Sequence, residues 1–328
     1  MNKEALYYEK LEDKKVRCSL CPHYCIIKDG KIGICMGKEN KGGILYSKNY
    51  ALTTSVAVDP IEKKPLYHFY PGTDILSISP NSCNLSCKFC QNWQISQMEA
   101  PTQYLSPERA VELAKKYNSI GISYTYTEPL TWYEYILDTA GMAKREGLKN
   151  VLVTNGFINE EPLLKILPLI DAMNIDVKSM DGSFYRKICS AQLAPVLKTV
   201  ELSQKSCHVE ITNLIITTLN DSDELFHKLT DWLASVNPNI PLHFSRYFPN
   251  YKLSLPPTPL DTLKRARDIA ANKINYVYVG NVREIEWNNT YCHNCKKLII
   301  SREGYSVAEK NYHEGKCNFC GTALPIIG

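Results

Sequence analysis

The chain contains the segment Cys83-Asn-Leu-Ser-Cys87-Lys-Phe-Cys90. Its C-x3-C-x2-C spacing supplies three thiolates, whereas an ordinary cysteine-ligated 4Fe-4S cluster binds four. One iron of such a cluster would therefore stay open to a ligand that is not protein. An open iron on a low-potential cluster is what the reductive cleavage of S-adenosylmethionine (SAM) requires, because its methionine amino and carboxylate groups can chelate the iron. The spacing thus predicts a radical enzyme.

The residues around this triplet favour a cofactor site over two simpler explanations. The triplet follows the short apolar run Ile75 to Ser79 and lies in a polar loop with Pro80 and Asn81, where the carboxyl end of a strand would open into a site. Phe89, between the second and third cysteines, offers an aromatic face that can pack on adenine. The alternatives are a zinc site completed by a distant histidine, or cysteines that simply lie in a reduced interior.

Length and composition allow one large domain with two small modules. The chain has 328 residues, 44% of them hydrophobic, which is enough for a barrel-sized core. We expect a Cys-rich amino-terminal module over residues 1–50, a core barrel over 51–290 and a carboxy-terminal module over 291–328. The net charge of +4, from 38 basic and 34 acidic residues, is too balanced to indicate a nucleic-acid partner.

The cysteine content and the lack of long apolar segments predict a cytoplasmic protein. Residues Met1 to Lys15 are charged and helix-like, without the apolar region of a secretion signal. No stretch approaches 18 consecutive apolar residues, so we expect no membrane span. Thirteen cysteines in the cytoplasm are better explained by metals than by disulfides. Only Cys189 and Cys207 lie outside three cysteine groups, and we expect both to be small buried side chains.

The carboxy-terminal group consists of two C-x2-C pairs separated by 21 residues: Cys292, Cys295, Cys317 and Cys320. Each pair lies in a turn-like sequence, so that four thiolates can close a tetrahedron around a structural zinc ion. A rubredoxin-like iron site for electron delivery has the same spacing and is the alternative. We expect His293 and His313 to be exposed polar residues, because four cysteines already fill the site.

The amino-terminal group has the spacing C-x2-C-x3-C-x9-C and consists of Cys18, Cys21, Cys25 and Cys35. A segment this short has little core of its own, so four cysteines within 18 residues indicate a compact knuckle held by a metal. Both zinc and a second iron-sulfur cluster are compatible with this spacing.

The region between these modules alternates β-rich runs with amphipathic stretches, which favours repeated βα units around a parallel sheet. The expected strands are Ile75 to Pro80, Gly121 to Thr127, Val151 to Asn155, Ala172 to Lys178, Val209 to Thr217 and Pro241 to Tyr247. The expected helices are Pro107 to Tyr117, Thr131 to Glu146, Glu160 to Ile170, Leu193 to Lys205, Asp223 to Val236 and Leu260 to Asn272. Six strands with six helices predict an incomplete barrel or a curled open sheet, in which ligands bind at the carboxyl ends of the strands.

Polar residues collect at those strand ends. Glu128 follows the second strand and could accept a hydrogen bond from the methionine ammonium. Asn155 ends the third strand and belongs to the same rim. Asp176 and Lys178 are two apart at the end of the fourth strand, so they share a face and could bind ribose hydroxyls and a carboxylate. A solvated strand end is the plainer explanation of an isolated Asp-x-Lys pair.

His243 and Arg246 lie at the end of the last expected strand and are the candidates for substrate contact. An imidazole could move a proton there, and a guanidinium could bind a carboxylate.

The sequence resembles the radical SAM superfamily through its CxxxCxxC triplet, with a core from about Leu76 to Gly280. It is similar to enzymes related to the activating enzyme of pyruvate formate-lyase, and in particular to the AmmeMemoRadiSam branch. The segments that carry this resemblance are Asp59-Pro-Ile-Glu-Lys-Lys-Pro-Leu-Tyr-His68-Phe, Cys90-Gln-Asn-Trp-Gln-Ile-Ser96 and Tyr278-Val-Gly-Asn281-Val.

The resemblance implies an α/β fold with a partial (β/α)6 barrel, a 4Fe-4S cluster, and cleavage of SAM to methionine and a 5'-deoxyadenosyl radical that abstracts hydrogen from a substrate. The Gly-Gly-Glu motif of the family, which holds the methionine amino group, corresponds to Tyr126-Thr127-Glu128, where only the carboxylate is kept. Two motifs of the activating enzymes, Asp-Thr-Asn-Gly and Asp-Leu-Lys, correspond to Val153-Thr154-Asn155-Gly156 and Asp176-Val-Lys178.

The resemblance also implies partners and leaves the substrate open. A radical SAM enzyme needs one external electron, from a flavodoxin or ferredoxin, and the branch co-occurs with Memo-like and AMMECR-like proteins. A three-component pathway acting on a small molecule or a modified protein is one expectation. A glycyl-radical activase is the alternative within the enzyme class. A non-catalytic zinc-binding scaffold, in which all three cysteine groups are structural, is the alternative outside it.

Overall fold

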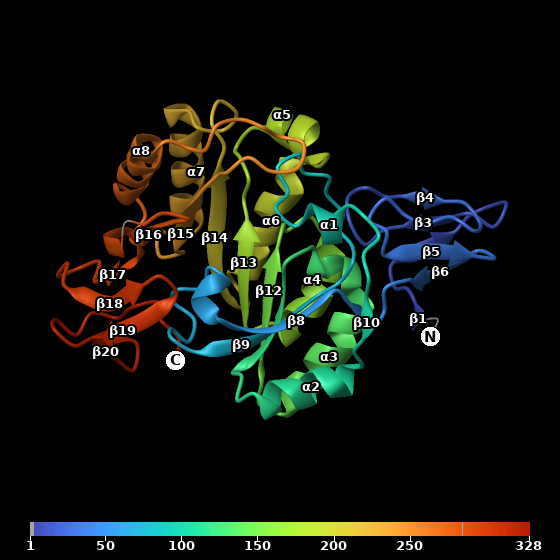
Figure 1. Cartoon of the computed structure of the whole chain (residues 1–328), viewed down its shortest axis with the longest axis horizontal. Coiled ribbons are helices and arrows are strands. Elements are labelled where there is room, and N and C mark those ends of the chain that lie inside the picture. Colours follow the sequence, from blue (N-terminus) through green and yellow to red (C-terminus); the bar gives the residue numbers. More distant parts are fainter. Residues whose placement is uncertain (1–2, 284) are drawn as a thin grey trace.

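The computed structural model describes residues 3–283 and 285–328, and its centre is one curled sheet of eight strands (Figure 1). The spatial order is β16-β15-β14-β13-β12-β11-β9-β8. The strands are β8 (Ser55–Pro60), β9 (Asp74–Ser79), β11 (Gly121–Tyr124), β12 (Lys149–Thr154), β13 (Ala172–Asp176), β14 (His208–Ile215), β15 (Leu242–Arg246) and β16 (Val277–Gly280). From β9 to β16 every neighbouring pair is parallel, and β8 is added antiparallel to β9 at one edge.

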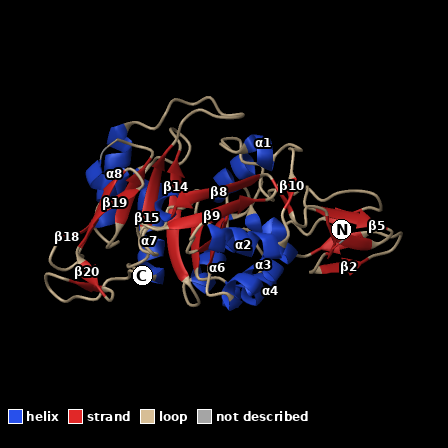
Figure 2. Ribbon diagram, turned by 60° about the horizontal axis from the view of Figure 1, so that its bottom comes forward, coloured by secondary structure: helices blue, strands red, loops and turns tan. Residues whose placement is uncertain are grey.

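Six helices connect the parallel strands and cover the outer face of the sheet (Figures 1 and 2). They are α2 (Pro107–Lys116), α3 (Tyr133–Arg145), α4 (Glu160–Ile166), α6 (Leu193–Ser203), α7 (Asp223–Val236) and α8 (Leu260–Ala271), and shorter turns form α1 (Trp93–Ser96) and α5 (Gly182–Phe184). None of the helices described here is long and apolar enough to cross a membrane.

Local sequence accounts for where these elements begin and how closely they pair. The Ser106 hydroxyl accepts a hydrogen bond from the Arg109 N–H at 3.2 Å, and Pro107 occupies the first position of α2, as is favourable at a helix start. Gly121 begins β11, where a Cβ atom would lie only 1.9 Å from the Lys149 carbonyl oxygen. A glycine is therefore required for β11 to pair with β12 at this point.

The predicted partial (β/α)6 barrel is confirmed, and each of the six expected strands and helices is present. Two strands of the eight-stranded sheet, β8 and β16, were not predicted. Strand β16 has only four residues, and β8 carries Asp59 and Pro60 within an otherwise short apolar run, so neither gives a clear alternating pattern. Within the described ranges, no pairing joins β16 to β8, and the barrel is open between these edges.

The amino-terminal module consists of two small sheets packed on the barrel beside α3 and α4 (Figure 1). Its strands are β1 (Lys3–Glu4), β2 (Tyr8–Lys10), β3 (Val16–Cys18), β4 (Ile26–Ile27), β5 (Lys38–Lys41) and β6 (Ile44–Ser47), followed by β7 (Leu52–Thr53), which pairs with β10 (Gln103–Tyr104). Val16 and Ile27 belong to the same apolar core as the barrel. The fully buried Lys38 in β5 pairs with Glu134 in α3 and so fastens the module to the barrel.

The expectation of a helical start over residues 1–15 is wrong in the described part, and residues 1–2 of that range lie outside it. Two short strands replace the helix, because Tyr7, Asp13 and Lys14 adopt positive φ angles that interrupt any helix.

The carboxy-terminal module lies at the opposite end of the molecule from the amino-terminal one (Figure 2). Its strands are β17 (Thr290–Tyr291), β18 (Leu298–Glu303), β19 (Ser306–Lys310), β20 (Tyr312–His313) and β21 (Lys316–Cys317), with a small apolar core of their own. The expected boundary at residue 290 falls inside β17. The buried Arg302 of β18 donates a hydrogen bond to the Tyr67 carbonyl at 2.7 Å and thereby holds the module against the floor of the barrel.

Candidate active site and metal centres

A cavity of about 310 Å³ opens at the carboxyl ends of the parallel strands. Its walls come from the loop after β9 and from the ends of β11 to β15. The residues that sequence analysis assigned to the cofactors all line it: Cys83, Cys87, Phe89, Cys90, Glu128, Asn155, Asp176 and Lys178. The structure therefore brings together side chains that are up to 95 positions apart in the chain.

The three cysteines of the central triplet face this cavity from one loop. The Leu85 N–H donates to the Cys83 sulfur at 3.4 Å, and the Ser96 hydroxyl lies 3.2 Å from the Cys90 sulfur. Burial raises the pKa of the Cys83 and Cys90 thiols above their usual range, so neither would ionise readily without a metal. Three thiols around a cavity with room beside them suit a cluster that keeps one iron open to a small ligand.

Cys189 is a buried neighbour of the triplet that sequence analysis treated only as a small hydrophobe. It is fully buried, as expected, and its carbonyl accepts a hydrogen bond from the Ser86 N–H at 3.0 Å. The neighbouring Cys189 side chain holds the pKa of Cys87 below its usual range. Cys189 does not line the cavity, so it supports the cysteine loop from behind.

Glu128 is a buried carboxylate at the end of β11. It accepts hydrogen bonds from the Thr154 hydroxyl at 2.7 Å, the Asn155 N–H at 2.8 Å and the Leu130 N–H at 3.0 Å. Burial nevertheless raises the pKa of Glu128 to about 7, because its ionised form has lost water. A buried carboxylate of this kind is stabilised when it accepts a further hydrogen bond from a group such as an amine.

The backbone before Glu128 keeps the conformation of a glycine although no glycine is present. Tyr126 has a φ angle of +66°, in the left-handed region that glycine adopts readily. Its hydroxyl donates to Asp59, which also accepts from Lys63 and Lys64, and its carbonyl accepts from the Asn92 side chain at 2.6 Å. These contacts hold Tyr126 in the left-handed conformation.

The Asp176–Lys178 pair lies on the wall formed by β13. The Lys178 ammonium donates to the Asp176 carboxylate at 2.9 Å and lies 5.8 Å from the centre of the Phe89 ring. Burial by itself lowers the pKa of Lys178. The attraction of the Asp176 carboxylate outweighs this effect, so that the pKa of Lys178 lies well above its usual range. Lys178 therefore stays charged, and the pair offers both a cation and hydrogen-bond acceptors to a ligand.

His243 and Arg246 do not line the cavity, contrary to what their position at a strand end indicated. His243 is buried one layer deeper, where its Nε2 bonds Glu210 at 2.6 Å. Arg246 donates to the Thr258 carbonyl at 2.8 Å. Ser245, between them, reaches the cavity instead. The sequence predicts where β15 ends, but it does not reveal whether His243 or Ser245 reaches the cavity.

Several lining residues were not singled out as site residues. They are Lys63, Gln91, Asn92, Ser96, Thr125, Tyr126, Thr127, Thr212, Ser245 and Asn281, among others. Asn281 has a φ angle of +60° and donates to the Ser245 hydroxyl at 3.0 Å. Lys63 and Asn281 lie in segments that carry the family resemblance, and this resemblance was the only indication in the sequence that they belong to the site.

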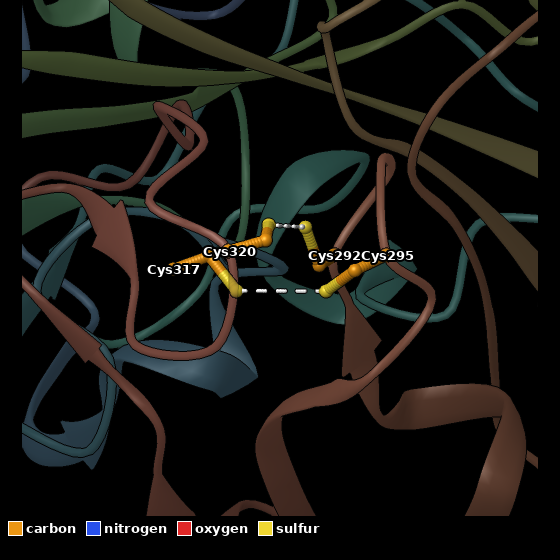
Figure 3. A group of neighbouring side chains, drawn as sticks. All are labelled: Cys292, Cys295, Cys317 and Cys320. Atoms are coloured by element: carbon orange, nitrogen blue, oxygen red, sulfur yellow. Dashed lines mark hydrogen bonds between the residues drawn. The ribbon is translucent and has the colours of Figure 1, made fainter.

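The four carboxy-terminal cysteines form a compact group that could hold one metal ion (Figure 3). Their sulfurs lie within 4.8 Å of one another, with 3.7 Å between Cys292 and Cys320 and 3.7 Å between Cys295 and Cys317. Four thiolates bound to one zinc ion at about 2.3 Å would be separated by about 3.8 Å. The geometry therefore fits one tetrahedral ion. His293 instead bonds the Tyr276 hydroxyl, and His313 is exposed, as predicted.

The amino-terminal cysteines surround a small enclosed hollow on the other side of the cysteine loop. They line it together with Lys38, Asn84 and several apolar side chains. His23 is outside this lining, and its Nε2 lies 2.7 Å from the Asn84 carbonyl oxygen.

Comparison with known families identifies the central region. The family model of the radical SAM superfamily matches residues 77–233, which contain the cysteine triplet, Glu128 and the Asp176–Lys178 pair. Across its whole length, the chain is 47% identical over 334 residues to an uncharacterised protein of Methanocaldococcus jannaschii, covering 99% of each chain.

Other relatives and one solved structure cover part of the chain. A biotin synthase of Nitratiruptor is 30% identical over 198 residues, covering 57% of this chain and 70% of its own. The pyruvate formate-lyase-activating enzyme of Clostridium pasteurianum is 26% identical over 164 residues, covering 47% and 67%. The fold is also similar to SuiB of Streptococcus suis bound to S-adenosylmethionine, with a TM-score of 0.50 and 15% identity, over 61% of this chain and 48% of that one.

Proposed function

Because this chain belongs to the radical SAM superfamily, we propose that Cys83, Cys87 and Cys90 hold a catalytic 4Fe-4S cluster and that the cavity beside them binds SAM. One observation carries the proposal: the three thiols share this cavity with Glu128, a buried carboxyl group, and Lys178, a half-buried cation, which follow different strands. SAM offers the matching groups, an amino group and a carboxylate at one end and hydroxyls and adenine at the other.

When bound, the cluster would supply one electron to SAM and so release methionine and a 5'-deoxyadenosyl radical that takes a hydrogen atom from the substrate. The protein residues bind and orient SAM. Glu128 accepts a hydrogen bond from the methionine amino group, and Asp176 accepts from ribose hydroxyls. Lys178 pairs with an anionic group, and Phe89 packs on adenine. Since Glu128 and Phe89 are buried, the walls that they form would also keep water from a reactive intermediate.

The substrate donates this hydrogen atom and would enter the cavity from its open side. The resemblance to the AmmeMemoRadiSam branch supports a multi-component system with Memo-like and AMMECR-like proteins. A flavodoxin or ferredoxin would deliver the electron. A cytoplasmic location suits both the thirteen free cysteines and an oxygen-sensitive cluster.

The test is anaerobic formation of 5'-deoxyadenosine. The protein is reconstituted with iron and sulfide, reduced with dithionite and incubated with SAM, and the nucleoside is quantified. We expect formation by the wild type and by Cys207→Ala, a cysteine outside the three groups, and none by Cys87→Ala. A reducible cluster that binds no SAM would refute the proposal. Two or three tightly held zinc ions with no iron-sulfur cluster and no SAM binding would favour the zinc-binding scaffold.

A glycyl-radical activase is a second candidate, supported by the similarity to the pyruvate formate-lyase-activating enzyme. Such an enzyme takes a hydrogen atom from a glycine of a partner protein. Incubation with a candidate partner would then give a stable protein radical detectable by electron paramagnetic resonance (EPR). A small-molecule substrate would leave no such signal.

A further inference from the structure

Four thiols of the amino-terminal module surround a hollow that the proposed chemistry does not use. Cys18 ends β3, and the loop between β3 and β5 provides Cys21, Cys25 and Cys35. The centre of a water-sized sphere could move through about 20 Å³ of this hollow without touching the surrounding atoms. A single zinc ion leaves no such space, because all four thiolates contact the metal.

The sulfur spacing separates this group from the carboxy-terminal one. In the described part of the chain, only the carboxy-terminal cysteines form a group whose ligand atoms all lie within 4.8 Å of one another. The amino-terminal cysteines are more widely spread, and so are Cys83, Cys87 and Cys90. Wide spacing is expected for a 4Fe-4S cluster, since each cysteine binds a different iron atom. In the described residues, the sulfur atoms are therefore closely spaced in the carboxy-terminal group and more widely spaced in the other two groups.

The surroundings of the hollow suit a buried cluster. Besides the four cysteines, the polar side chains in the lining come from Lys38, Asn84 and Thr131. The rest is apolar and includes Leu20, Ile27, Leu130 and Phe157, so these walls would shield a bound cluster from solvent.

We propose that Cys18, Cys21, Cys25 and Cys35 bind a second 4Fe-4S cluster. The hollow is lined by Asn84, the residue next to Cys83 in the chain, while Cys83 itself lines the catalytic cavity. The two sites are therefore separated by little more than one stretch of backbone.

This placement suits electron relay, a role that rests on the proposed function. A flavodoxin-class donor would lose one electron to the second cluster, which would pass that electron to the catalytic cluster. Asn84 is fixed between the sites, since its side chain donates to the Phe157 carbonyl at 2.7 Å and its own carbonyl lies 2.7 Å from the His23 ring.

The test of the second cluster is the metal content of a variant that lacks the catalytic cysteines. The triple variant Cys83→Ser/Cys87→Ser/Cys90→Ser is produced anaerobically with iron, and its iron, labile sulfide and zinc are measured. We expect about four irons per chain in this variant and about eight in the wild type, because each cluster contains four. A reduced triple variant should also give the EPR signal of a 4Fe-4S cluster.

A triple variant that is folded by circular dichroism but holds zinc in place of iron would overturn the proposal. Adding Cys21→Ser to the triple variant should abolish or alter the remaining EPR signal, and an unaltered signal would also overturn it. If the second cluster is present but the wild type makes no 5'-deoxyadenosine, the proposed function fails while the cluster assignment stands.

The relay is tested in Cys21→Ser with the catalytic cysteines intact. We expect SAM binding to be kept and the rate of 5'-deoxyadenosine formation with flavodoxin to fall at least tenfold. An unchanged rate in a variant shown to lack the second cluster would overturn the relay.

Discussion

Replacing Glu128 by glutamine should weaken the pH dependence of SAM binding. Burial raises the pKa of Glu128 to about 7, and its ionised form is the stronger hydrogen-bond acceptor for the methionine amino group. At pH 6 about one tenth of Glu128 is ionised and at pH 7 about one half, so this carboxylate should make SAM bind about fivefold more tightly at pH 7. The affinity rises with pH because the proton must leave Glu128 before the carboxylate can accept the hydrogen bond. The α-amino group of SAM, with an ordinary pKa of about 7.7–8.0, must also lose a proton to bind iron, and this second rise with pH should be the same in the wild type and the variant.

Equilibrium dialysis of cluster-loaded protein under nitrogen measures this effect. Glu128→Gln should bind SAM about 10- to 100-fold more weakly at pH 7, the loss expected for one charged hydrogen bond of about 1.5–3 kcal/mol, and between pH 6 and 7 its affinity should rise about fivefold less than that of the wild type. Glu112→Gln, an exposed carboxylate on α2, is the matched control and should resemble the wild type. An equal rise of affinity in the wild type and in Glu128→Gln between pH 6 and 7 would refute the assigned role of Glu128.

Three further outcomes test the modules. Cys295→Ala should remove about one zinc per chain, measured by mass spectrometry, and leave the iron content unchanged; zinc retained in full would contradict the tetrahedral site. Lys38→Met should destabilise the protein by about 3–5 kcal/mol in thermal unfolding, because it leaves Glu134 buried and unpaired. Lys38→Met/Glu134→Gln should recover part of that loss, and no recovery would contradict the pairing. Arg302→Met should expose the carboxy-terminal module to limited proteolysis, whereas the exposed Arg265→Met should not.

The barrel was predictable because each βα unit carries its own periodic signal. Helix α7 begins and ends at Asp223 and Val236, as predicted, since an apolar stripe and the Ser222 cap mark it locally. Strand β16 was missed because four residues are too few to show a period. The amino-terminal strands were missed because they have only two to four residues. Strands this short form through pairing with their neighbours in the sheet and leave no pattern in their own sequence.

The candidate site also contains residues that the sequence predicted and residues that it did not. The cysteine triplet and the Asp176–Lys178 pair were predictable, because the spacing within one loop or strand fixes their geometry. The positions of His243 and Lys63 were not. Their distance from the cavity depends on how deeply each strand or loop sits in the curled sheet, which is set by packing among segments far apart in the chain.

The left-handed backbone at Tyr126 links two walls of the cavity. A non-glycine residue in this conformation costs about 1 kcal/mol or more, and the hydrogen bond from its hydroxyl to Asp59 helps to hold it there. Asp59 in turn binds Lys63, which lines the cavity. A ligand that displaces Lys63 would therefore act on the backbone that presents Glu128. Occupancy of the substrate side and affinity for SAM are then thermodynamically coupled, and each must change the other by the same factor.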